Sequence, residues 1–154
     1  MSLQTDIIFI QALQQSQAID NIVGDRIYGT AIPLPDEDAE NVPVPYLIVT
    51  FDGMQNDQGT KDNLYEGSED RVQIGIEVVA ETRPQLALLT QTVRDTVKAQ
   101  FIVNIEAMDA GSQDDDLRLT PLDYQLTASA VQYDGDKPCY WQVLNYACVT
   151  NSNE

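Results

Sequence analysis

Residues 69–101, EDRVQIGIEVVAETRPQLALLTQTVRDTVKAQF, contain the two clearest secondary-structure patterns in the chain. The first part, 69–81, has an apolar residue at every second position, which predicts a strand with one buried face and one mostly polar face. These apolar positions are Val72, Ile74, Ile76 and Val78. The second part has apolar residues at spacings of three and four, which predicts an amphipathic helix. Its stripe consists of Leu86, Leu89, Val93, Val97 and Phe101.

The segment Thr82-Arg83-Pro84-Gln85 at the start of this helix has the form of a capping box. We expect the Thr82 side chain to accept a hydrogen bond from the backbone N–H of Gln85, and the Gln85 side chain to reach back. Arg94 and Lys98 share another face of the helix. Lys98 lies towards the C-terminal end, where the helix dipole favours a cation.

Upstream of this unit, residues 3–19 predict a second amphipathic helix, and Gly24 is expected to end that unit. The helical stripe consists of Leu3, Ile7, Ile10 and Leu13. Residues 33–45 are rich in proline and acidic side chains, which predicts a solvated loop. The apolar segment 46–52 predicts a central strand. Residues 53–68 contain scarcely any hydrophobic residue and predict a long loop, of a kind that is often functional.

Downstream, residues 104–123 lose every periodic pattern and predict a third acidic loop. Leu126–Tyr133 and Cys139–Val149 then predict a hairpin around the turn-forming segment Asp134–Pro138. No linker divides the chain, so we expect residues 1–154 to form one domain. The predicted fold is α+β, with a largely antiparallel or mixed sheet and two main helices packed on one face.

Charge separates this chain from most globular domains. Eight basic and 25 acidic residues give a net charge of −17 and a pI near 4.1. Such a surface disfavours binding to nucleic acid, since that affinity rests on Lys and Arg neutralising phosphates. Anionic membranes are disfavoured for the same reason. The acidity either keeps the protein soluble or provides a surface that faces DNA without binding it.

Two cysteines, Cys139 and Cys148, fall in one predicted strand. Their nine-residue separation spans about 30 Å of strand, whereas a disulfide needs Cα atoms within about 7 Å. We therefore expect no internal disulfide, which suits a reducing compartment. The start of the chain does not resemble a signal peptide, so a cytosolic location is expected. Zinc has no expected site, because the chain has no histidine and no close cysteine pair.

Catalytic patterns are weak in this sequence. Glu77, on the polar face of its strand, is the one acid whose surroundings indicate partial burial, so it is the candidate for carboxylate catalysis. The alternative for Glu77 is an ordinary strand carboxylate. No histidine base, nucleophile elbow or phosphate-binding glycine loop is present, and no cofactor is expected.

Cation binding has one candidate segment, Asp109–Asp116, which contains the triple acid Asp114-Asp115-Asp116. It lacks the alternating aspartates and the closing glutamate of an EF-hand. We therefore expect a solvated run of charge there, with weak cation binding as the alternative.

The C-terminal hairpin carries a cluster of aromatic residues, namely Tyr133, Tyr140, Trp141 and Tyr146. Such residues are enriched at protein interfaces, and they also pack across strands within a sheet. Strand alternation separates Trp141 from Tyr140 and Tyr146, so one side of the hairpin can pack inward while the other stays available.

The order of these parts resembles the small tail-completion proteins of tailed phages, a tail-terminator-like group that caps the tail tube at its junction with the head. The resemblance rests on an N-terminal helix, the segment Ile22-Val-Gly-Asp-Arg-Ile-Tyr28, a Pro-rich loop, the strand opening at Pro45-Tyr46, and the strand–helix unit at 69–101. It covers residues 3–100 and, more loosely, the terminal hairpin. The long acidic loops and residues 102–125 depart from the pattern.

This resemblance implies a structural role without chemistry, with ring oligomers, commonly hexamers, that contact other tail or head–tail connector proteins. It implies location in the host cytoplasm during assembly and then in the virion tail. Arg26 and Tyr28 become candidates for subunit or tube contacts, and Tyr140, Trp141 and Tyr146 are the further candidates. The alternative is that Arg26 is a surface charge and that Tyr28 is an aromatic residue of the core.

Two classes of function therefore stay open from the sequence. One is an assembly protein, which needs a flat self-complementary surface. The other is a small-ligand or regulatory binding domain, which needs a concave apolar site and could use residues 53–68 as a lid.

Overall fold

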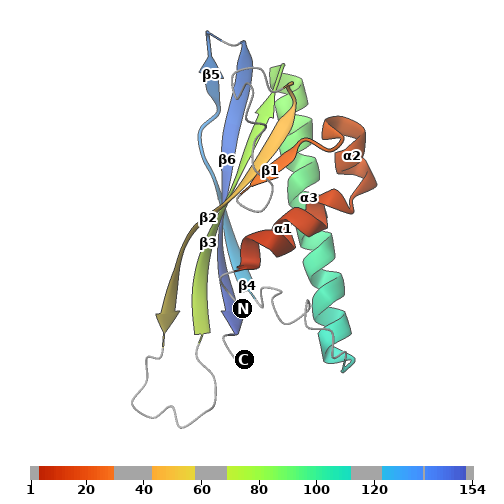
Figure 1. Cartoon of the computed structure of the whole chain (residues 1–154), viewed down its shortest axis with the longest axis vertical. Coiled ribbons are helices and arrows are strands. Elements are labelled where there is room, and N and C mark those ends of the chain that lie inside the picture. Colours follow the sequence, from red (N-terminus) through yellow and green to blue (C-terminus); the bar gives the residue numbers. More distant parts are fainter. Residues whose placement is uncertain (1–3, 30–42, 58–68, 112–122, 137, 152–154) are drawn as a thin grey trace.

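The computed structural model describes residues 4–29, 43–57, 69–111, 123–136 and 138–151. These described residues form three helices and six strands (Figure 1). In chain order these are α1 (Thr5–Gln14), α2 (Gln17–Val23), β1 (Ile27–Gly29), β2 (Tyr46–Asp57), β3 (Glu69–Ala80), α3 (Arg83–Asp109), β4 (Asp123–Ala128), β5 (Gln132–Asp134) and β6 (Cys139–Asn151). The predicted α+β class is confirmed.

The strands form one sheet in the order β1-β2-β3-β6-β4, and β5 also pairs with β6. Only β1 and β2 are parallel, so the sheet is mixed but largely antiparallel. All three helices lie on the same face of the sheet, and the other face carries no described helix (Figure 1). A sheet covered on one side leaves its second face available for solvent or for another protein.

Two of the predicted loops are shorter than the sequence indicated. Residues 53–57 continue β2, where a register shift at Phe51/Gly53 lets the strand resume pairing with β3. Residues 104–109 continue α3. The remainder of these loops, and most of the acidic segment 33–45, lie outside the described residues.

The predicted helix 3–19 is wrong in its length, because two helices replace it. The chain breaks at Gln15 and Ser16, and the Ser16 hydroxyl accepts a hydrogen bond from the backbone N–H of Ile19 at 3.3 Å. Serine is a favoured N-cap, so α2 starts anew at this point. Gly24 ends α2 with φ 61°, a conformation that glycine adopts without steric cost, as predicted.

The predicted hydrogen bond at the start of α3 is confirmed. The backbone N–H of Gln85 donates to the Thr82 hydroxyl at 3.2 Å. The Gln85 side-chain oxygen accepts from the backbone N–H of Glu81 at 2.9 Å, one residue earlier than in a standard capping box. The predicted apolar stripe from Leu86 to Phe101 is buried throughout.

The first strand of the predicted C-terminal hairpin is interrupted. It divides into β4 and β5, with Ser129 between them, and both pieces pair with β6. The backbone N–H of Ser129 donates to the Val143 carbonyl, and the Val143 N–H donates to the Ser129 hydroxyl, both at 2.9 Å. The serine side chain thus replaces one ladder bond of regular pairing.

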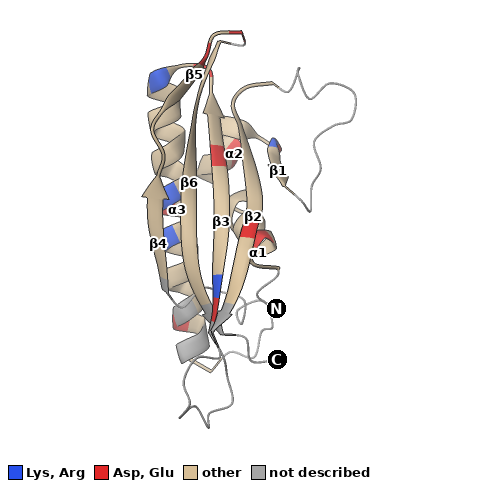
Figure 2. Ribbon diagram, turned by 90° about the vertical axis from the view of Figure 1, so that its left-hand side faces the viewer, with Lys and Arg blue, Asp and Glu red and all other residues tan. Residues whose placement is uncertain are grey.

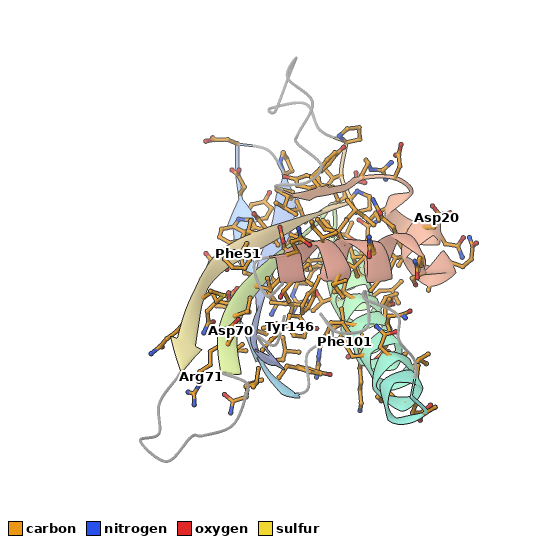
Figure 3. All side chains as sticks on the ribbon, turned by 60° about the horizontal axis from the view of Figure 1, so that its bottom comes forward. Asp20, Phe51, Asp70, Arg71, Phe101 and Tyr146 are labelled. Atoms are coloured by element: carbon orange, nitrogen blue, oxygen red, sulfur yellow. The ribbon has the colours of Figure 1, made fainter. Side chains whose placement is uncertain are left out.

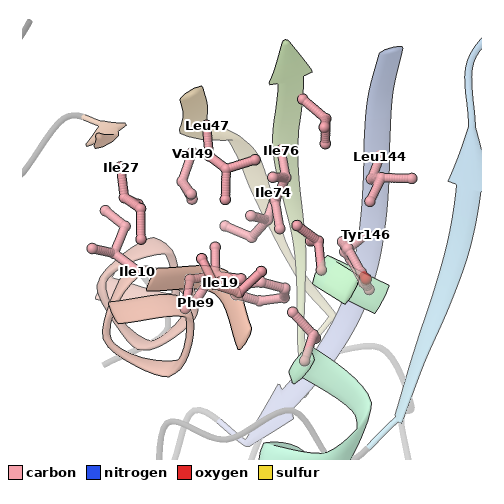
Figure 4. Packing of buried hydrophobic residues seen from close by; sticks show 14 of the residues in the cluster. Phe9, Ile10, Ile19, Ile27, Leu47, Val49, Ile74, Ile76, Leu144 and Tyr146 are labelled. Carbon is pink, nitrogen blue, oxygen red and sulfur yellow. The ribbon is translucent and has the colours of Figure 1, made fainter. Parts of the chain in front are cut away.

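The core lies between the sheet and the helices (Figure 4). Its centre is a chain of aromatic rings from four elements. The ring centroid of Phe9 lies 5.0 Å from that of Phe101 and 5.1 Å from that of Tyr146. Tyr124 of β4 lies 5.6 Å from Tyr146. Figure 3 shows Phe101 and Tyr146 in the space between α3 and the sheet. None of the described helices is long and apolar enough to cross a membrane.

Candidate protein–protein interface

The face of the sheet opposite the helices carries a group of mostly apolar side chains near the start of β2. Because side chains alternate along a strand, the neighbours of buried core residues point to this face. Two rows cross the central strands in register. We call them the outer patch, which consists of Tyr46, Ile48, Glu77, Val79, Trp141 and Val143.

The outer patch is partly withdrawn from water although no described helix covers it. Val79 is only 2% exposed, with Tyr46 and Trp141 as its register partners on the two sides. The other members are half-buried. Figure 2 looks onto this face and shows few charged residues along β2, β3 and β6. In a chain of net charge −17, such a neutral area is typical of a surface that another protein covers.

Glu77 is the one charged member of the outer patch. Its register partners are Ile48 and Val143, and within the described part of the chain no hydrogen bond or ion pair holds its carboxylate. Burial raises the pKa of this carboxyl, because removal from water disfavours the charged form. The pKa of the Tyr46 hydroxyl is also raised, first by burial and then by the nearby Glu77.

The chemistry available around Glu77 is limited. The patch offers one carboxylate among aliphatic and aromatic side chains. Asp52, further along β2, is exposed and accepts a hydrogen bond from the Thr50 hydroxyl at 2.9 Å. No group of acidic or thiol side chains in the described residues could hold a metal ion. The triple acid at 114–116 lies outside those residues. The surroundings of Glu77 suit pairing with a cation from outside the chain.

Tyr28 and Arg26, two of the predicted contact residues, lie next to this patch. Tyr28 pairs with Ile48, and its ring centroid lies 6.2 Å from that of Tyr46. It is half-buried and extends the patch onto β1. Arg26 is also half-buried, and its Nε donates to the Pro45 carbonyl at 2.9 Å. That bond ties β1 to the chain just before β2.

Tyr140 and Tyr146 lie on the helix side of the sheet, whereas Trp141 lies on the outer patch, so the predicted separation is confirmed. Tyr146 is 1% exposed, and burial raises the pKa of its hydroxyl. Tyr140 is half-buried, and its ring lies 4.9 Å from that of Tyr133. The structure thus brings Tyr28 and Trp141 to one surface and places Tyr146 in the core.

Five members of the outer patch were not among the predicted contact residues. Glu77 had been considered only as a catalytic candidate, and the other four are Tyr46, Ile48, Val79 and Val143. A signal for three of them is present in the sequence. Ile48, Val79 and Val143 are apolar at positions where strand alternation calls for polar residues. When the residues at both odd and even positions of a strand are apolar, the pattern indicates that both faces of the strand are covered by protein.

Both cysteines lie in β6 and neither forms a disulfide, as expected from their separation. Burial raises the pKa of Cys148 to about 12, which keeps the sulfur protonated at neutral pH. A buried, protonated thiol is a poor nucleophile and a poor metal ligand.

A groove of about 520 Å³ lies between α3 and the α1–α2 junction. Its lining is mainly small or polar, with Ala12, Ala99, Thr92, Thr96 and Val103 among the residues. Ser16 and Thr96 place their hydroxyls 3.3 Å apart across it. The lining therefore lacks the aromatic and large apolar side chains of a typical small-molecule pocket.

Comparison with models of protein families and with curated proteins gave no match. Among solved structures, the chain is similar to one from the "Virion of native gene transfer agent (GTA) particle". The sequences are 12% identical, the TM-score is 0.59, and the match covers 96% of this chain and 94% of that chain. The two proteins thus share a fold over nearly their whole length.

Proposed function

We propose that this chain is a structural protein of a phage-like virion, of the tail-completion or tail-terminator type. It acts by forming a ring and by contacting other tail or head–tail proteins, without catalysis or a cofactor. The observation that carries this proposal is the fold shared with a virion particle chain over 96% of this sequence. The resemblance of residues 3–100 to tail-completion proteins supports the same role.

The surface of the molecule is consistent with assembly. The outer patch is broad, part-buried and almost uncharged, whereas the groove at α3 is lined by small and polar side chains with no aromatic residue. A ligand-binding domain requires a concave apolar site, so these features favour the assembly role over that alternative.

The charge of the chain fits a channel through which DNA passes. Cationic walls would hold the duplex by its phosphates. An anionic lumen repels the duplex over about 8 Å at physiological salt. We therefore propose that the ring directs carboxylates towards its lumen. The same charge opposes association of subunits, so we expect rings to form more readily as salt rises.

Light scattering across a salt series tests this function. The expected result is a low mass at low salt and a discrete multiple of 17.1 kDa at higher salt, with rings in negative-stain images. A mass of one subunit at every salt and protein concentration would contradict the ring. In that case, binding of small molecules at the α3 groove becomes the function to examine.

A further inference from the structure

The outer patch needs a cation that its own subunit does not provide. Glu77 is half-buried between Ile48 and Val143 and has no ion pair within the described part of the chain. If a neutral surface covered the patch, this carboxylate would lose its remaining water without gaining a partner. A buried unpaired charge is among the most destabilising features of an interface. The covering surface should therefore combine apolar side chains with Lys or Arg.

The same chain carries a surface with that composition on α3. Arg83, Arg94 and Lys98 lie within about 60° of each other around the helix axis, at 100° per residue. Figure 2 shows basic residues in blue on α3, both beside β4 and at the end of the helix near β5. All three are exposed, and Lys98 has no ion pair or hydrogen bond within the described residues. The nearest acid on α3, Asp95, already accepts a hydrogen bond from Gln91 at 2.8 Å.

An exposed apolar side chain accompanies these cations. Ile102 is 46% exposed and lies one turn after Lys98, so the two side chains are neighbours on the helix surface. This part of α3 therefore offers a cation beside an aliphatic group. The outer patch offers an anion between two aliphatic groups. The two surfaces are complementary in both charge and hydrophobicity.

We propose that the outer patch of each subunit is covered by α3 of a second copy of this chain, with Lys98 and Arg94 of that copy facing Glu77. This inference rests on the proposed function, and it names the two surfaces that form the ring contact. The patch and the basic side of α3 are different surfaces of one subunit. Their contact is therefore head-to-tail, the type that closes into a ring when the rotation between subunits allows.

The alternative contact between two copies is unfavourable at neutral pH. A two-fold contact between two outer patches would bring two half-buried Glu77 carboxylates together. Like charges at a desolvated contact repel strongly, and the excess of acid over base adds to this repulsion. Head-to-tail packing avoids it, because every Glu77 meets a cation.

Charge reversal tests the proposal on the full chain. Glu77→Lys should raise the protein concentration for half-assembly by about 30-fold or more, as loss of a desolvated ion pair does. The double variant Arg94→Glu/Lys98→Glu should show a similar loss. Combining all three substitutions should restore much of the assembly, because the pair is reversed. Light scattering gives the half-assembly concentration, and thermal unfolding checks that each variant is folded.

Two controls match the charge changes. Asp52→Lys makes the same change on an exposed acid of β2, and Arg71→Glu reverses an exposed cation of β3. Both should assemble like the unmodified chain.

If Glu77→Lys also assembles normally, the interface assignment is wrong while the ring remains. If Glu77→Lys fails but the α3 variant assembles, the covering surface is not α3. If the unmodified chain never assembles, both this inference and the ring are wrong.

Discussion

Glu77 of β3 lies directly opposite Val143 of β6, on the face of the sheet that no described helix covers. An acid between aliphatic neighbours on a free face is costly for an isolated subunit. The cost is understandable if the residue serves a contact that forms only in the assembly. Strained or unfavourable local choices of this kind are expected at functional surfaces.

Replacing Glu77 by Gln should stabilise the isolated subunit at neutral pH. Since burial raises the Glu77 pKa above its ordinary value of 4.5, the folded state binds this proton more tightly than the unfolded state. The free energy of unfolding therefore falls as pH rises from 4.5 through the raised pKa. Glu77→Gln should remove this loss, so its advantage should be present at pH 7 and fade towards pH 4.5. Urea unfolding of both proteins at several pH values measures this difference in the free energy of unfolding. A difference that does not change with pH would contradict the burial of the charge.

Leu13 and Leu88 provide a matched test of the core. Leu13 of α1 is fully buried, whereas Leu88 of α3 is 60% exposed. Leu13→Ala should lower the free energy of unfolding by about 2–5 kcal/mol, because it removes buried methyl groups and leaves a cavity. Leu88→Ala should change it by no more than about 0.5 kcal/mol. Equal effects in urea unfolding would show that α1 does not pack on the sheet as described.

The N-terminus of α3 depends on one hydroxyl. Thr82→Ala should cost about 1 kcal/mol of folding stability, because the backbone N–H of Gln85 loses its acceptor. Thr92→Ala is the control, since that hydroxyl donates to the Leu88 carbonyl within the helix, at 2.7 Å, and caps nothing. The control should be neutral or slightly stabilising. Thermal unfolding of both variants gives the comparison, and a loss confined to Thr92→Ala would contradict the capping role.

Trp141 has the largest side chain of the outer patch, which also contains Tyr46, so its truncation should weaken assembly. Trp141→Ala should raise the half-assembly concentration about 30-fold, the effect expected of a central interface aromatic. Tyr133→Ala is the control, because Tyr133 is 57% exposed and packs on Tyr140, away from the patch. Light scattering of both variants at the same salt concentration gives their half-assembly concentrations. An equal loss in both would place the contact elsewhere.

Local patterns in the sequence predicted the elements that depend on few residues. The alternation from Val72 to Val78 and the Thr82–Gln85 cap both appear in the structure, because period and capping are set by neighbouring side chains. The break at Ser16 was missed, since serine within an apolar stripe is compatible with a continuous helix. The interruption of the hairpin at Ser129 depends on bonds to β6 that are distant in sequence.

The candidate surface was only partly predictable for the same reason. Tyr28 was selected from the family resemblance and Trp141 as an aromatic residue of the hairpin, but their proximity to Glu77 depends on the order of strands β1, β2, β3 and β6. Tyr146 was also selected as an aromatic residue of the hairpin and is in the core. Composition alone does not distinguish an aromatic residue that packs inward from one that faces a partner.

The most direct measurement is the structure of the assembled protein by electron cryomicroscopy, at a salt concentration where light scattering shows a discrete oligomer. We expect a closed ring in which the outer patch of each subunit, with Glu77 and Trp141, is covered by α3 of its neighbour. A ring that leaves Glu77 and Trp141 exposed to solvent would contradict the proposed interface. Particles of one-subunit size at every salt concentration would contradict the structural role itself.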